Sequence, residues 1–282
     1  MIVVTGGSGQ LGTAFRSLLP DAAFPERDLV DLSDPDDLPE RLAALHPTVL
    51  INCAAYNAVD QAESEPQLAM TINGTAVGVM ARFAAEAGIA FVTFSSDYVF
   101  DGEADEPYLE SSPTAPINAY GRSKEEGERA AREANAGALV VRTSWVLSRT
   151  HESFLTRVLR LAAGPGAEVV SDRWGCPTLA DDLAEASLAA MNAGATGILH
   201  LTNTGPTTWF DLAREAAALA GLREGVVTPV PAHRRVEPAR RPRYGVLGSE
   251  RVEPLGLTPV PPWRERLPEV ISALRRAGLL EP

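Results

Sequence analysis

The first half of the chain alternates short apolar runs with segments whose apolar residues recur at helical spacing. Continuous apolar runs are typical of strands buried on both faces of a parallel sheet, and their alternation with helices is typical of βαβ units. The pattern therefore predicts an α/β fold with a doubly wound parallel sheet. The expected strands are residues 2–5, 48–53, 90–94 and 138–141, and the expected helices are residues 9–19, 35–45, 66–87 and 120–135.

After residue 145 this alternation loosens. Helical patterns cover residues 152–163, 179–193, 208–219 and 264–277, a strand is expected at 198–202, and prolines crowd between Pro229 and Pro262. The change in composition predicts a first domain over residues 1–145 and a smaller α/β domain over 146–282. Whether residues 198–203 return to the first domain is left open.

A glycine-rich segment, TGGSGQLG at residues 5–12, follows the first strand and opens the first helix. Its glycines fit the spacing of Gly6, Gly9 and Gly12, or that of Gly7, Gly9 and Gly12. Both place glycines where a turn is tight and where backbone approaches a pyrophosphate at a helix N-terminus. Residues 1–145 are therefore predicted to be a dinucleotide-binding Rossmann domain, which leaves 146–282 to bind substrate. The alternative is a plain glycine turn.

The second strand of such a domain would end about 20 residues further on, near FPERD at residues 24–28. An acidic side chain there binds a ribose 2′-hydroxyl, whereas an arginine accepts the 2′-phosphate of NADP. Arg27 favours NADPH. NADH stays open, because Glu26 or Asp28 could select it.

Tyr120 and Lys124 stand four residues apart at the start of a predicted helix, and Lys124 is the only lysine among 25 basic residues. This spacing puts both side chains on one helix face, so the ammonium can lower the pKa of the phenol and reach a ribose. Lowering a tyrosine pKa by ~3 units requires about 4 kcal/mol of differential stabilisation. We expect a tuned general acid; the alternative is a surface pair on an amphipathic helix.

Ser95, Ser96 and Asp97 come directly after the strand at 90–94. Ligands of open α/β sheets bind beyond the carboxyl ends of the strands, so Ser96 is predicted to donate to a substrate carbonyl oxygen. Alternatively, the serines only end the strand and cap the next turn of the chain.

The composition, 45% hydrophobic and 22% charged, indicates a folded protein, and its net charge of −12 disfavours nucleic acid and anionic membranes as partners. Two cysteines are too few for a disulfide scaffold. The N-terminus lacks the basic and apolar regions of a signal peptide, and no apolar run approaches a membrane span. A cytoplasmic protein is expected.

The histidines at 46, 151, 200 and 233 show no ligand spacing and are interpreted as structural or exposed.

Taken together, these motifs resemble the extended short-chain dehydrogenase/reductase family and, more narrowly, the dTDP-4-dehydrorhamnose reductases. The narrower resemblance depends on NCAAYNAVDQAESEP (52–66), FSSDYVFDG (94–102), PINAYGRSK (116–124) and RTSW (142–145). It continues weakly through GCPT (175–178), HLTNTGPTTWFDLA (200–213) and ARRPR (239–243), so that it spans nearly the whole chain.

This resemblance implies reduction of the 4-keto group of dTDP-4-dehydro-L-rhamnose to dTDP-L-rhamnose by a nicotinamide cofactor. Tyr120 would be the acid, Lys124 would hold the nicotinamide ribose, and Ser96 would polarise the ketone. Asp97, Tyr98, Trp145 and Arg241 would bind the nucleotide sugar. The cofactor would contact Tyr120, Lys124 and Arg27, together with Gly6, Gly9, Gln10, Leu11 and Gly12 near the pyrophosphate, Asp31 and Leu32 near the adenine, and Ala54, Ala55, Tyr56, Asn57 and Phe94 near the ribose and nicotinamide.

The chain also departs from the family pattern. Some members use a glutamate for a magnesium-linked dimer where this chain has Ala14, so no metal site is expected. Gly245 and Gly248 stand where a serine and an acidic residue are frequent. Arg241 and its neighbours at 240 and 243 would attract a pyrophosphate, or else be solvated loop residues.

Two other functions remain open. The SSDYVFDG and Tyr-Gly-x-x-Lys segments also resemble those of the regulatory β subunit of methionine adenosyltransferase, which is a binding partner, although the RTSW segment with Trp145 favours the reductases. The second alternative is another nucleotide-sugar reductase or epimerase of the extended family. A homodimer is also left open.

Overall fold

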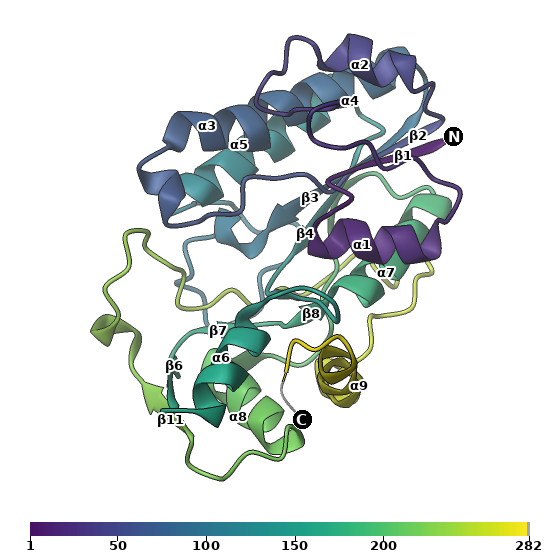
Figure 1. Ribbon diagram of the computed structural model, residues 1–282. Coiled ribbons are helices and arrows are strands. Elements are labelled where there is room, and N and C mark those ends of the chain that lie inside the picture. Colours follow the sequence, from purple (N-terminus) through teal and green to yellow (C-terminus); the bar gives the residue numbers. More distant parts are fainter. Residues whose placement is uncertain (281–282) are drawn as a thin grey trace.

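Five parallel strands form one sheet at the centre of the computed structural model, which describes residues 1–280 (Figure 1). Their order is β1-β2-β3-β4-β9. Each strand expected from an apolar run forms within two residues of its expected ends, and the predicted α/β parallel-sheet class is confirmed. The strands are β1 (Ile2–Thr5), β2 (Val49–Asn52), β3 (Ala90–Ser96), β4 (Leu139–Thr143) and β9 (Gly197–His200).

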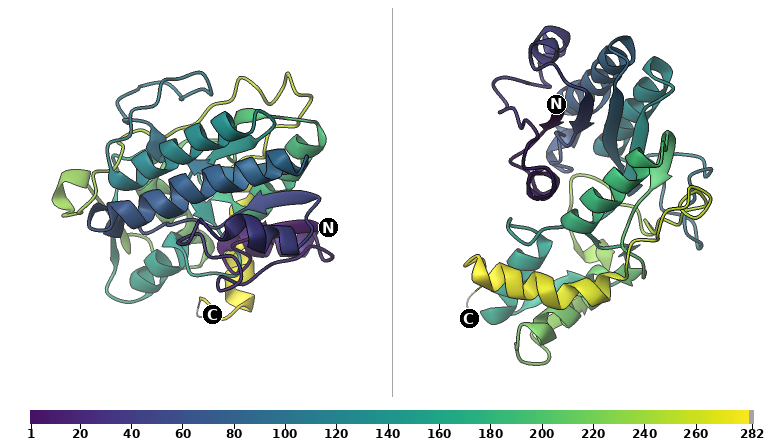
Figure 2. Two further views of the ribbon diagram at one scale, coloured as in Figure 1. Left: turned by 90° about the horizontal axis from the view of Figure 1, so that it is seen from above. Right: turned by 90° about the vertical axis from the view of Figure 1, so that its right-hand side faces the viewer.

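Helices cover both faces of this sheet (Figure 2). Because successive side chains of a strand point to opposite faces, Phe91 and Val140 enter the core under α4 and α5, whereas Val92 and Val141 enter the core under α1 and α7. All three central strands are thus buried on both sides. The covering helices are α1 (Gln10–Leu18), α2 (Leu38–Ala44), α4 (Ala76–Glu86), α5 (Ala119–Ala134) and α7 (Ala180–Asn192).

One predicted helix, residues 66–87, is divided into α3 (Pro66–Met70), a π-helical turn (Thr71–Thr75) and α4. The turn places buried Asn73, whose amide accepts from the Tyr56 backbone N–H at 2.9 Å and donates to the Ser123 hydroxyl at 3.0 Å. Over residues 1–280, only Pro66–Glu86 is long and apolar enough to cross a membrane, and 56% of its apolar window is buried inside the protein. It has the burial of a core helix.

The strand predicted near residues 24–28 does not form. Ala23 alone pairs with β1, donating to the Ile2 carbonyl at 2.8 Å and accepting from the Val4 N–H at 2.9 Å. The ladder ends there because Pro25 has no N–H to donate. The expectation of a second strand is therefore wrong, and the segment leaves the sheet as a loop.

A second core lies below the sheet in Figure 1, between α6 (Phe154–Ala163), α8 (Trp209–Leu219) and α9 (Trp263–Arg276). Trp263 and Leu155 are fully buried in it. β9 and α7 come from the second half of the chain but belong to the first core. Short strands pair around the second core: β5 (Val146–Leu147) with β8 (Thr178–Leu179), β6 (Ala167–Val170) with β11 (Val227–Val230), and β7 (Trp174–Gly175) with β10 (Thr207–Thr208).

Candidate active site

Gly6 and Gly9, in the loop between β1 and α1, and Gly12, in α1, have different roles. Gly6 has φ +69°, and a Cβ on Gly12 would overlap the Gly6 carbonyl oxygen, so both are required for the turn itself. A Cβ on Gly9 would meet only that same oxygen, at 3.4 Å, with open space otherwise. Gly9 is also the N-cap of α1, without a side-chain cap or an acidic residue in the first turn. The helix N-terminus is therefore open to an anion.

A pocket of about 500 Å³ lies beside this loop. Arg27 is 77% exposed at its rim, and its Nε lies 3.6 Å from Asp31 Oδ1. Hydrogen bonds from the Ser33 N–H and hydroxyl lower the pKa of Asp31, with Arg27 contributing less. This adenosine-side pocket contains nine of the predicted cofactor-binding residues: Gly6, Gly9, Arg27, Asp31 and Leu32, together with Ala54, Ala55, Tyr56 and Asn57, which were expected near the ribose and nicotinamide.

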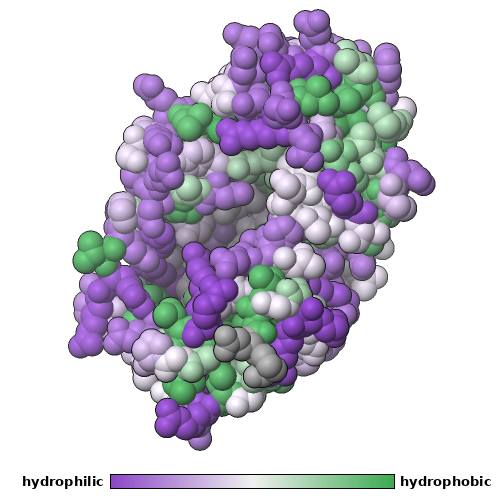
Figure 3. All heavy atoms as spheres, viewed as in Figure 1, coloured by the Kyte–Doolittle hydropathy of each residue, from purple (hydrophilic) through white to green (hydrophobic). Residues whose placement is uncertain are grey.

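A second cavity of about 710 Å³ continues from the loop to the carboxyl ends of β3 and β4. On this face the molecule is hollowed between the sheet and the second core (Figure 3). The cavity brings together all three predicted catalytic residues with Gln10, Leu11, Phe94, Asp97, Tyr98 and Trp145. Gly12 lines neither space, because it packs behind the loop.

Tyr120 and Lys124 both lie on the cavity side of α5. Asn118 caps this helix by accepting from the Gly121 N–H at 2.7 Å, which starts it one residue before Tyr120. Lys124 Nζ donates to the Phe94 carbonyl at 2.6 Å, and the Tyr120 ring meets the edge of Tyr98 at 5.5 Å between centroids. Both side chains are buried, so the surface-pair alternative is wrong.

The predicted lowering of the Tyr120 pKa is also wrong for this structure. Burial raises the pKa, with Asp97 and Tyr98 adding to the rise, and contact with Ser96 lowers it by less. Burial also lowers the pKa of Lys124 to about 8, against an opposing effect of Glu128. Desolvation is the largest effect on both pKa values, because removal from water disfavours the phenolate of Tyr120 and the ammonium of Lys124. The phenol thus keeps its proton at neutral pH.

Ser96 was interpreted from the sequence either as a donor to the substrate or as a cap at the end of the strand, and its position in the structure is compatible with both. Its hydroxyl accepts from the Tyr98 N–H at 3.2 Å, capping the 3-10 helix Asp97–Val99, and donates to Asp97 Oδ1 at 2.9 Å. It nevertheless lines the cavity. Burial raises the pKa of Asp97 to about 7.

Several cavity residues were not identified from the sequence. Ser95 and Thr143 are buried there with hydroxyls that have no partner among residues 1–280. Trp209 stacks on Trp145 with centroids 3.6 Å apart. His151, interpreted above as structural or exposed, also faces the cavity. Thr143 lies beside Ser96 in the register of β3 and β4, which the sequence alone does not give. Trp209 and His151 come from distant segments of the chain.

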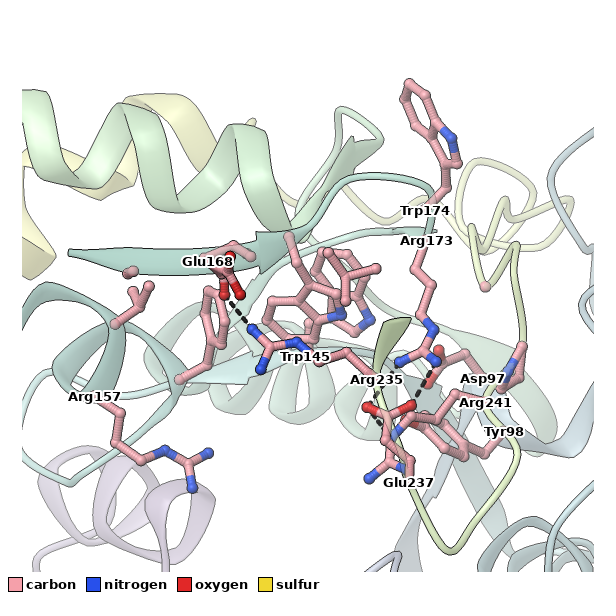
Figure 4. Close-up of a pocket in the computed structure, with 18 of the residues that line it drawn as sticks. Asp97, Tyr98, Trp145, Arg157, Glu168, Arg173, Trp174, Arg235, Glu237 and Arg241 are labelled. Atoms are coloured by element: carbon pink, nitrogen blue, oxygen red, sulfur yellow. Dashed lines mark hydrogen bonds and ion pairs between the residues drawn. The ribbon is translucent and has the colours of Figure 1, made fainter. Parts of the chain in front are cut away.

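An adjoining pocket of about 590 Å³ lies between β6, α6 and the loop at 235–242 (Figure 4). Arg241 lines it, but both oxygens of Asp60 bind its guanidinium at 2.7 and 2.8 Å. Arg173 is similarly bound by Glu237. Arg157 has no ion pair or hydrogen bond of its guanidinium with any described residue. Arg240 and Arg243 are exposed loop residues outside the pocket.

No group of three or more His, Cys, Asp or Glu side chains that could hold a metal ion lies in the described part of the chain.

The known proteins that this chain resembles include dTDP-sugar reductases. Residues 1–276 match the family model described as the RmlD substrate binding domain. The chain is 40% identical to a dTDP-4-dehydrorhamnose reductase of Streptomyces griseus, over 98% of this chain and 95% of that protein. It is 39% identical to a probable dTDP-4,6-dihydroxy-2-methyloxan-3-one 4-ketoreductase of Streptomyces antibioticus, over 96% of each. Among solved structures, a dTDP-4-dehydrorhamnose reductase of Bacillus anthracis in complex with NADP has a TM-score of 0.91 and 32% identity, over 96% of this chain and 98% of that one.

Proposed function

The chain belongs to the RmlD substrate-binding-domain family of dTDP-4-dehydrorhamnose reductases, and we propose that it reduces dTDP-4-dehydro-L-rhamnose to dTDP-L-rhamnose with NADPH. One observation carries the proposal for the site: the open N-terminus of α1 and the Tyr120–Lys124 pair line the same cavity. A dinucleotide bound along the loop would extend toward the pair at the ends of β3 and β4.

The residues present fit a bound dinucleotide. Gly9 leaves room for backbone approach, the first turn of α1 offers unpaired N–H groups, and the Oε1 atom of Gln10 is buried without a partner among residues 1–280. NADPH supplies the hydride when bound. Arg27 at the rim of the adenosine-side pocket would accept the 2′-phosphate, although its present contact is Asp31.

Tyr120 would donate the proton to the C4 oxygen of the sugar. Its raised pKa keeps the phenol protonated, as a proton donor requires. With a pKa of about 8, Lys124 is mostly an ammonium at neutral pH, and its positive charge would stabilise the phenolate left after transfer. Ser96, fixed by Asp97 and Tyr98, would orient the ketone beside Tyr120.

The nucleotide sugar would lie across the cavity and the adjoining pocket. Asp97, Tyr98, Trp145 and Trp209 line both spaces, so the sugar can reach Tyr120 while the nucleoside diphosphate occupies the pocket. Arg157 and Arg235 line this pocket without a carboxylate partner among residues 1–280. Because Arg235 donates to the Glu168 carbonyl, the unengaged guanidinium there is that of Arg157. It is therefore a better candidate for a phosphate than Arg241, whose charge is balanced by Asp60.

The wider context supports a cytoplasmic enzyme whose partner is a nucleotide sugar. A net charge of −12 opposes binding to nucleic acid or to anionic membranes. The two cores support a division at residue 145, with β9 and α7 returning to the dinucleotide-binding domain. A homodimer is compatible with the proposal.

The test is NADPH oxidation by the purified protein with dTDP-4-dehydro-L-rhamnose, with dTDP-4-keto-6-deoxy-D-glucose, and with UDP- or GDP-linked keto sugars. The proposal expects the first to be turned over with the highest kcat/KM. Preference for the second would place the chain with relatives such as the dTDP-4-keto-6-deoxy-D-glucose reductase of Streptomyces niveus, to which it is 37% identical. Absence of oxidation with every sugar would favour the non-catalytic regulatory function.

A further inference from the structure

His151 lies beside the first turn of α1, although it comes from the loop between β5 and α6. Its Nε2 atom is 3.0 Å from the Ser8 carbonyl oxygen and 3.5 Å from the Thr13 hydroxyl. Ser8 immediately precedes the N-cap of α1, and Thr13 lies one turn into the helix. The imidazole therefore spans the segment Gly9–Gly12 and faces the cavity that Gly9, Gln10 and Leu11 line.

The contacts of His151 also indicate which ring nitrogen carries a proton. A carbonyl oxygen can only accept, so Nε2 must be the donor toward Ser8. Nδ1 lies 3.0 Å from the Thr150 hydroxyl and 3.3 Å from the Ser148 hydroxyl, which orient the ring from behind. An N–H donor is thus held at the edge of the phosphate-binding turn.

Few other side chains could serve a pyrophosphate at this place. Lys124 is the one lysine or arginine among the described residues that line the cavity, and it is engaged with Phe94 at the far end. In the loop of His151, Arg149 is paired with Asp181 and Glu269, and Glu152 is paired with Arg160. Because Arg149 and Glu152 are held in these ion pairs, the imidazole of His151 is the polar side chain of this loop that reaches the first turn of α1.

We propose that His151 binds the pyrophosphate of the dinucleotide, with its Nε2–H donating to a phosphate oxygen instead of to the Ser8 carbonyl. This inference rests on the proposed use of NADPH. The N–H groups of the first turn of α1 would bind one side of the pyrophosphate and His151 the other. Because His151 precedes α6, a bound dinucleotide would fix this loop beside the substrate cavity, so that cofactor binding prepares the substrate site.

The experiment compares the dissociation constants of three ligands by calorimetry. NADPH and 2′-phospho-ADP-ribose contain the pyrophosphate, whereas adenosine 2′,5′-bisphosphate does not. For His151→Ala we expect about tenfold weaker binding of the first two and less than about twofold change for the third, the size of one hydrogen bond to a charged group. His151→Gln, which keeps a donor, should recover part of the loss.

His233→Ala is the matched control, since His233 is exposed in the 3-10 helix Ala232–Arg234, away from the cavity. It should bind all three ligands as the parent does. Equal weakening of all three by His151→Ala would indicate a damaged loop, and NADPH binding within about twofold of the parent would show that His151 makes no such contact; either result overturns the inference. Failure of the parent to bind NADPH would instead refute the proposed function.

Discussion

Replacement of Lys124 by methionine should stabilise the folded protein more at neutral than at alkaline pH. Lys124 is buried, and burial lowers its pKa from 10.5 to about 8. Between these values the unfolded chain holds a proton that the folded chain has lost, so the stability of the parent rises with pH across this range. Methionine fills a similar volume and has no charge to bury.

The pKa shift sets the size of the effect. It corresponds to a cost of about 3 kcal/mol to the folded parent at pH 7 and about 1 kcal/mol at pH 10. The variant also loses the hydrogen bond to the Phe94 carbonyl, but it does so at both pH values. The stability difference between variant and parent should therefore be about 2 kcal/mol more favourable at pH 7 than at pH 10.

Urea unfolding of both proteins at the two pH values measures this difference directly. Because Lys124 is the only lysine, the two proteins have no other lysine whose titration could differ. A pH-independent difference would show that the ammonium is not desolvated in the folded state, and a difference of opposite sign would show that Glu128 over-compensates its burial. The variant should meanwhile lose reductase activity, because the cation beside Tyr120 is gone.

Three further substitutions test separate parts of the site. Tyr120→Phe should lower kcat at least ~100-fold with NADPH affinity unchanged, because only the proton donor is lost; turnover within a few-fold of the parent would remove the phenol from the mechanism. Arg27→Ala should weaken NADPH more than NADH in a binding titration, and equal weakening would mean that Arg27 does not touch the 2′-phosphate. Arg157→Ala should raise the KM for the nucleotide sugar about tenfold without changing that for NADPH, and an unchanged KM would remove Arg157 from the substrate pocket.

The spacing of apolar residues along the sequence was enough to predict the strands of the central sheet and the helix face that carries Tyr120 and Lys124. Apolar runs located the strands, and spacing put Tyr120 and Lys124 on one helix face, which the structure turns toward the glycine loop. The strand near residue 24 was predicted from the expected architecture and not from an apolar run, and it does not form.

Features that depend on distant contacts could not be predicted in this way. Arg241 meets Asp60 across 181 residues, and His151 meets Ser8 across 143. The direction of the Tyr120 pKa was wrong because burial, which spacing does not reveal, exceeds any effect of the nearby lysine. The Thr143 hydroxyl, which has no partner within residues 1–280, becomes visible only once β3 and β4 are in register.

The most direct test of the proposed reduction is the fate of the hydride in a reaction with dTDP-4-dehydro-L-rhamnose and NADPH deuterated at nicotinamide C4 on the transferred face. We expect the deuterium to appear at C4 of the product sugar, as seen by proton NMR, and Tyr120→Phe to slow its appearance strongly. NADPH consumed without deuterium at C4, or no consumption by the parent protein, would contradict it.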